Sequence, residues 1–160
     1  TRRSSDLDAA DTGQSREDRW ESLKDQERAS KGAESAMDGV ALALPALLRA
    51  EKLQKRAARQ GFDWPDVAGP AAKVREELEE LATAGTDAER IEEGGDLLFA
   101  AVNLLRAYGV PAEEALRAAN RKFERRYRAM EQLADGRFAD LSLEAQEELW
   151  IAVKVAEKAS

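Results

Sequence analysis

The sequence of 160 residues lacks both cysteine and histidine. Without cysteine there can be no disulfide, thiol nucleophile or Cys-ligated zinc. Without histidine there can be no Ser-His catalysis, no His-ligated metal and none of the Glu-x-x-His motifs of di-iron helical bundles. Any chemistry must therefore be carried by carboxylates, lysine, arginine or a bound metal.

Aromatic residues are few and positive charge is not in excess. Aromatics make up 6% of the chain, charged residues 36% and hydrophobic residues 43%, with a formal net charge of -7. This composition favours one domain of long helices and offers no global basic footprint for nucleic acid. No apolar run approaches the ~20 residues of a membrane span, and no signal-like segment opens the chain. We therefore expect a cytoplasmic protein with neither a nucleic-acid nor a membrane partner.

The order of turn and capping signals predicts an all-α fold. Pro45, Pro70 and Pro111 suit the first turns of helices, Thr86 opens a capping box, and Ser142 is a typical N-cap. These signals predict helices over 45–60, 70–85, 86–109, 111–134 and from 142 onward. Residues 1–15 are polar and predicted to be a disordered linker, and 16–31 form a thinly apolar connector helix. We accordingly divide the chain into a linker with its connector, 1–32, and a domain, 33–160.

Two of these helices each carry an acidic pair three residues apart. Glu77 and Glu80 share one flank of the first, and Glu93 and Asp96 share a narrow polar stripe of the second with Asn103. The rest of the second helix is apolar, which predicts a buried helix whose carboxylates must be paired or metal-bound. Four acids with no nitrogen or sulfur ligand suit Mg²⁺, with Mn²⁺ as a substitute. The competing interpretation, a solvated acidic surface, fits Glu-rich runs in general.

Gly94 and Gly95 stand between the two acids of the second pair. Each glycine inside a helix costs roughly 1 kcal/mol relative to alanine. Their presence indicates either a close approach of another backbone or local softness beside the acids.

The strongest positive cluster lies at 120–127. Lys122 and Arg126 flank one side of the apolar stripe of the 111–134 helix, and Asn120 flanks the other. Arg and Lys are suited to phosphate oxygens, and we expect these two head groups to face solvent. Trp150 and Lys154, four residues apart, could stack on a base and reach a phosphate. A basic solvated face, paired with nearby glutamates, is the alternative for the cluster, and simple packing is the alternative for Trp150.

From Pro45 to Lys154 the chain resembles the C-terminal domain of the MazG family of nucleoside triphosphate pyrophosphohydrolases, within the all-α NTP pyrophosphatase superfamily. The resemblance is carried by 44–58, Gly61-Phe-Asp-Trp64, 73–81, 92–104 and 118–127, with Trp150 and Lys154. The family signature is EExxE followed by ExxD. Here the signature is met by Glu76, Glu77, Glu80, Glu93 and Asp96.

The resemblance implies a four- to five-helix bundle that dimerises and hydrolyses nucleoside triphosphates to the monophosphate and pyrophosphate with Mg²⁺. It assigns the metal to Glu77, Glu80, Glu93 and Asp96. Glu76 is the candidate general base by position, so the predicted catalytic pair is Glu76 and Glu77. The predicted substrate-binding residues are Asn103, Asn120, Lys122, Arg126, Trp150 and Lys154. Because bases would be recognised mainly by stacking, we expect broad base specificity and a role in nucleotide-pool housecleaning.

Gly94 departs from the family pattern, which usually has a bulky apolar residue there. A soft helix at this point would lower activity. The alternatives to a broad enzyme are a narrower dCTP, dUTP or phosphoribosyl-ATP pyrophosphatase, and a catalytically weakened helical dimerisation module.

Overall fold

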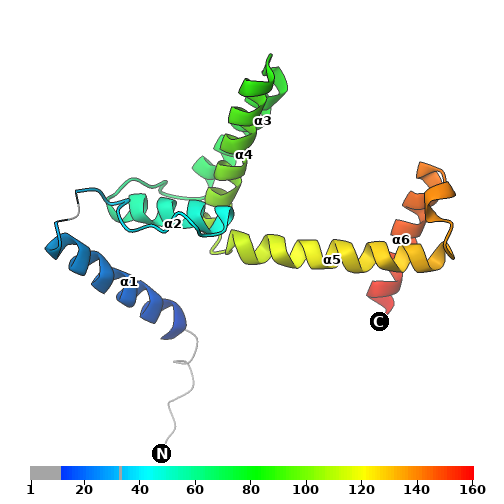
Figure 1. The fold of residues 1–160 in the computed structure, drawn as a ribbon, viewed down its shortest axis with the longest axis horizontal. Helices are drawn as coiled ribbons and strands as arrows, with labels where there is room; N and C mark the ends of the chain where they lie inside the picture. The colour runs from blue at the N-terminus through cyan, green and yellow to red at the C-terminus, as the bar shows by residue number, and fades with distance from the viewer. Residues whose placement is uncertain (1–11, 33) are drawn as a thin grey trace, which may run out of the picture. The chain divides into compact units, whose positions relative to one another are not determined.

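The computed structural model describes residues 12–32 and 34–160, and these residues form helices and no strand (Figure 1). The predicted all-α fold is confirmed. The elements are α1 (Thr12–Ser30), α2 (Ala46–Arg59), α3 (Ala68–Thr83), α4 (Asp87–Ala107), α5 (Ala112–Leu133), the 3₁₀ turn η1 (Phe138–Asp140) and α6 (Leu143–Ala159). Within the described residues, no helix has the length and apolar character that crossing a membrane requires.

The capping signals placed most helix ends correctly. Thr86 Oγ1 accepts a hydrogen bond from Glu89 N at 3.2 Å, and Glu89 Oε2 accepts from Thr86 N at 3.0 Å, which completes the predicted capping box of α4. Ser142 Oγ accepts from Ala145 N at 3.2 Å at the start of α6. The linker prediction is wrong for 12–15, which belong to α1. The remainder of the predicted linker lies outside the described residues.

The chain divides into two compact units, whereas the predicted boundary at 32/33 stays a prediction. The first unit contains Lys52–Asp63 together with the described part of Thr1–Leu44. In it, α1 is joined to α2 mainly by charge. Glu21 pairs with Lys52 at 3.4 Å and with Arg59, and Asp25 pairs with Arg59 and with Arg56 at 3.8 Å. Helix α1 therefore contacts α2 mainly through ion pairs and not through its thin apolar stripe.

The second unit, Pro45–Glu51 with Trp64–Ser160, holds both acidic helices and the basic cluster. Helix α3 packs along α4, and α5 packs on α6 (Figure 1). The buried apolar side chains are mostly small: Ala100, Val102, Ala112, Met130, Ala134 and Val153. The connection before α3 is tight, because a Cβ added to Gly69 would lie 2.6 Å from Cδ2 of Trp64. Glycine is needed where this ring packs on the helix start, which favours a packing role for Trp64.

The predicted burial of α4 is wrong for the single chain. Ile91 is 78% exposed and Leu98 61% exposed, and only Ala100 and Val102 on this helix are buried. The predicted core stripe of α5 shows the same departure, because Phe123 is 57% exposed while Met130 is buried. Helical periodicity identified residues that share a face, but it carried no information about what covers that face.

Candidate metal and nucleotide site

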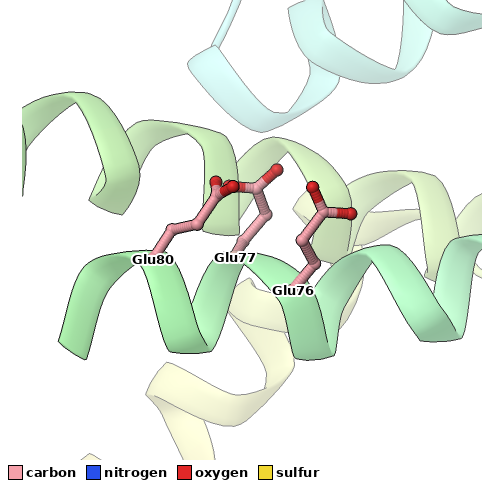
Figure 2. A group of neighbouring side chains, drawn as sticks. All are labelled: Glu76, Glu77 and Glu80. Carbon is pink, nitrogen blue, oxygen red and sulfur yellow. The ribbon is translucent and has the colours of Figure 1, made fainter. Parts of the chain in front are cut away.

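The packing of α3 along α4 brings the predicted acidic residues together. Ligand atoms of Glu77, Glu93 and Asp96 all lie within 4.8 Å of one another, and so do those of Glu76, Glu77 and Glu80. Figure 2 shows the second group projecting from one side of α3, with the carboxylates of Glu77 and Glu80 turned toward each other. The four predicted ligands therefore fall into two overlapping groups, and Glu77 is common to both.

Glu77 is the buried member of the site. The residue is 3% exposed, and its Oε2 atom is buried without a hydrogen-bond partner. A buried carboxylate oxygen without a partner is unfavourable in a folded protein. A divalent cation among these oxygens would satisfy it, so the residues present fit a bound metal ion.

The prediction that Glu93 and Asp96 are the buried pair is wrong for the single chain. Glu93 is half-buried and Asp96 is exposed. Their stripe on α4 lies beside large apolar residues that are themselves exposed, such as Leu98. An apolar neighbour in sequence predicts a buried carboxylate only when that neighbour is covered.

The pKa values of Glu77 and Glu80 are shifted in opposite directions. The pKa of Glu77 is lowered, chiefly because its carboxylate accepts a hydrogen bond from the Lys73 ammonium. The pKa of Glu80 is raised, chiefly because its carboxyl interacts with the side chain of Glu77, and also because it loses solvent and lies near the negative charges of Glu77, Glu93 and Glu76. This charge repulsion, which reaches from α4 to α3, is the kind that a bound cation would relieve.

The two glycines of α4 make no close approach. A Cβ built on Gly94 or Gly95 would meet no atom within 4 Å. The interpretation that these glycines admit another backbone is therefore wrong for the single chain. Local softness of the helix remains as the account of Gly94.

The basic cluster lies on a different helical hairpin, formed by α5 and α6. Arg126 donates to Glu157 of α6 through Nε at 3.0 and 3.1 Å and through Nη2 at 2.8 Å, and its guanidinium lies 5.4 Å from the Trp150 ring centroid. Its side chain is only 17% exposed, so the prediction of a solvent-facing head group is wrong for Arg126. The cause is an acidic partner thirty-one positions away, which local spacing could not reveal.

The other predicted nucleotide residues are placed as follows. The Trp150 ring packs near Phe123 with centroids 5.9 Å apart, and Lys122 lies close enough to Glu157 to lower the pKa of that carboxyl, after the larger effect of Arg126. Asn120 and Lys154 are exposed. Asn103 accepts hydrogen bonds from Arg106 of its own helix at 2.8 and 3.2 Å. The structure brings Lys122, Arg126 and Trp150 together at one helix pair, and their nucleotide role stays a prediction.

One charged residue of the site was not assigned from the sequence. Lys73 Nζ lies 2.7 Å from Glu77 Oε1 and 2.9 Å from Glu76 Oε1. The signal was available, because Lys73 precedes Glu77 by four residues and Glu76 by three on the same helix.

Comparisons with known proteins agree with the family resemblance. Residues 50–123 match the family described as phosphoribosyl-ATP pyrophosphohydrolase. A protein of Escherichia coli K12 named nucleoside triphosphate pyrophosphohydrolase is 46% identical over 144 residues, covering 85% of this chain and 55% of that protein. A Thermotoga maritima protein named nucleoside triphosphate pyrophosphohydrolase/pyrophosphatase MazG is 42% identical over 138 residues, covering 84% and 54%. The chain thus spans about half the length of these curated relatives.

Proposed function

Because the chain belongs to the MazG family of nucleoside triphosphate pyrophosphohydrolases, we propose that it hydrolyses nucleoside triphosphates to the monophosphate and pyrophosphate in a Mg²⁺-dependent reaction of broad base specificity. The observation that carries the proposal is the convergence of Glu77, Glu93 and Asp96 within 4.8 Å, with one oxygen of Glu77 buried and unbonded. The cytoplasmic location stays a prediction.

The metal would be held by Glu77, Glu80, Glu93 and Asp96. Bound there, Mg²⁺ would supply a Lewis acid that makes water more acidic and offsets negative charge on phosphate oxygens. Glu80 must be ionised to serve as a ligand, and its raised pKa means that protons compete for it more strongly than for an ordinary glutamate.

Glu76 is the proposed general base. Its side chain is more than half exposed, and it lies in one acidic group with Glu77 and Glu80. The water oxygen would bond to phosphorus as the bond to the departing pyrophosphate breaks, and the Glu76 carboxylate would accept the proton from that water. Lys73 donates a hydrogen bond to the Glu76 carboxylate at 2.9 Å, which favours one orientation of that carboxylate.

The nucleotide would be held by Lys122, Arg126, Trp150 and Lys154. Trp150 offers a ring for stacking, which tolerates every base and therefore supports broad specificity. Arg126 is already paired with Glu157, so contact with a phosphate would require that it exchange or share this partner. Asn103 and Asn120 complete the proposed substrate set as neutral hydrogen-bonding residues.

We also propose that the active form is a homodimer. Large apolar side chains are exposed on α3, α4, α5 and α6: Leu78, Ile91, Leu98, Phe99, Leu116, Phe123, Leu143 and Ile151. Exposed apolar surface shared by neighbouring helices is typical of a protein interface. A second copy of the chain is the proposed partner.

Incubation of the purified chain with each NTP and dNTP, with Mg²⁺ or with a chelator, tests the activity directly. Release of pyrophosphate from most nucleotides, abolished by the chelator and by Glu77→Gln, is the expected result. Metal-independent release would contradict the site, and release from a single nucleotide would contradict broad specificity.

A second candidate is favoured by one specific match. Residues 50–123 correspond to the phosphoribosyl-ATP pyrophosphohydrolase family, so phosphoribosyl-ATP belongs in the same panel. Turnover of this substrate alone would favour the narrow enzyme. No turnover of any substrate by a folded, metal-binding dimer would favour the weakened dimerisation module.

A further inference from the structure

Lys73 places a positive charge against two acids of the site, Glu76 and Glu77. Its ammonium contacts Glu77 Oε1 at 2.7 Å and Glu76 Oε1 at 2.9 Å. These contacts raise the pKa of Lys73, with the hydrogen bond to Glu77 as the largest cause and that to Glu76 next. The group is therefore a full positive charge at any physiological pH.

The two oxygens of Glu77 are in different situations. Oε1 is bonded to Lys73, whereas Oε2 is buried and has no hydrogen-bond partner. The side chain of Glu77 is 4% exposed and that of Lys73 is 41% exposed, so the lysine reaches from solvent onto a buried carboxylate. One oxygen is thus neutralised by the protein itself, and the other is buried and unbonded in a residue whose carboxylate lies within 4.8 Å of those of Glu93 and Asp96.

We propose that Lys73 is the built-in counter-cation of the metal-free site, offsetting the charge of Glu76 and Glu77 until a divalent ion takes over that task. The inference rests on the metal site of the proposed function and deepens it. Lys73 is a positioning residue here, because it acts on the metal through the two glutamates.

Two consequences follow from the charges. In the metal-free protein, Lys73 reduces repulsion among the converging acids and so stabilises the fold. Toward a divalent ion it acts oppositely, because an ammonium group close to the site repels the ion and occupies one oxygen of a ligand. Lys73 therefore stabilises the metal-free chain and lowers its affinity for the metal.

The test compares Lys73→Met with the wild-type chain in two measurements that need no turnover. Binding of Mn²⁺ alone is followed by titration calorimetry, and thermal unfolding is recorded in a chelator. Removing one charge within about 5 Å of a divalent ion corresponds to about a tenfold change in Kd. We expect Lys73→Met to bind Mn²⁺ about tenfold more tightly and to melt at a lower temperature in the chelator.

Two further variants serve as controls. Lys73→Arg retains the charge and should keep both values near the wild type. Arg117→Met removes one positive charge from an ion pair of the same i,i+4 type, with Glu113 at 3.1 Å on α5, and should leave Mn²⁺ affinity unchanged.

Unchanged or weaker Mn²⁺ binding by Lys73→Met, with normal binding by the wild type, overturns the role of Lys73 and leaves the metal site intact. Failure of the wild type to bind Mn²⁺ overturns the metal site and the inference together. If Lys73→Met does not fold, the wild type still decides the matter by amine labelling and mass spectrometry. Acylation of Lys73 should become faster when Mn²⁺ is added, and an unchanged rate overturns the inference.

Discussion

At the scale of single residues, Glu77 is the residue that links the two acidic groups of the candidate site. It belongs to both acidic groups, it is the buried member, and only one of its oxygens is bonded. Because Glu77 is buried, its replacement could also act by disturbing the packing, which makes it an ambiguous test of the metal site. Among the proposed ligands, Asp96 offers the cleaner mutation since it is exposed and its loss should not disturb packing.

We predict that Asp96→Asn abolishes metal-dependent stabilisation and lowers pyrophosphate release by at least about 100-fold, because a neutral amide removes one charged ligand of a catalytic metal. The melting temperature in a chelator should stay close to that of the wild type. Differential scanning calorimetry with and without Mn²⁺, beside a pyrophosphate assay, measures both effects.

Glu92→Gln is the matched control. Glu92 is an exposed acid on the same helix, outside both acidic groups, so its loss should change neither property. Equal loss of metal stabilisation in the two variants would mean that general negative charge, rather than a defined site, attracts the ion.

At the scale of helices, sequence reasoning worked where the cause is local. The capping box at Thr86, the N-cap at Ser142 and the prolines before α2 and α5 placed helix starts within a residue or two, because each acts within one turn. It failed where the cause is distant. The exposure of Leu98 and the pairing of Arg126 with Glu157 depend on which surfaces meet, which periodicity within one helix does not encode.

Gly94, inside α4, gives a prediction at this scale. Gly94→Ala should raise the free energy of unfolding by ~0.5 to 1 kcal/mol, because glycine loses more conformational entropy in a helix and the added Cβ meets no atom within 4 Å. Chemical denaturation of the two proteins measures the difference. A destabilised Gly94→Ala variant would mean that the helix needs the room, for example against a second copy of the chain.

The pairing of α5 with α6 gives a pH prediction. The hydrogen bond from Arg126 lowers the pKa of Glu157 below its usual 4.5, so the pair stabilises the fold above about pH 4.5 and loses this effect as pH falls through the lowered pKa. Glu157→Gln should therefore melt below the wild type at pH 7, and the difference should shrink at pH 3.

Glu124→Gln tests whether the effect belongs to the contact between helices. Glu124 pairs with Arg128 at 2.9 Å within α5, where an exposed i,i+4 pair contributes little. A difference between Glu157→Gln and wild type that is the same at pH 3 and pH 7 would show that the pair does not act through its charge.

At the scale of the molecule, many large apolar side chains of the described chain remain exposed to solvent. The described chain buries mainly small apolar residues, while leucines, isoleucines and phenylalanines on both hairpins of the second unit remain exposed. The predicted core stripes group residues that do share one face of a helix, although that face is not buried in the single chain. We expect a second copy of the chain to bury these apolar residues. The sequence of one chain indicates this partner only because it contains more apolar surface than the single chain buries.

The last prediction tests that cover. Sedimentation equilibrium should find the wild type dimeric at micromolar concentration. Leu98→Asp should weaken the dimer by at least about 1.5 to 3 kcal/mol, since it removes a leucine from the interface and places a charge there. Circular dichroism should show unchanged helix content, because Leu98 is 61% exposed in the single chain.

Leu42→Asp, at an 85% exposed leucine of the other unit, should leave the dimer intact. A monomeric wild type, or equal weakening by both substitutions, would contradict a dimer built on these helices.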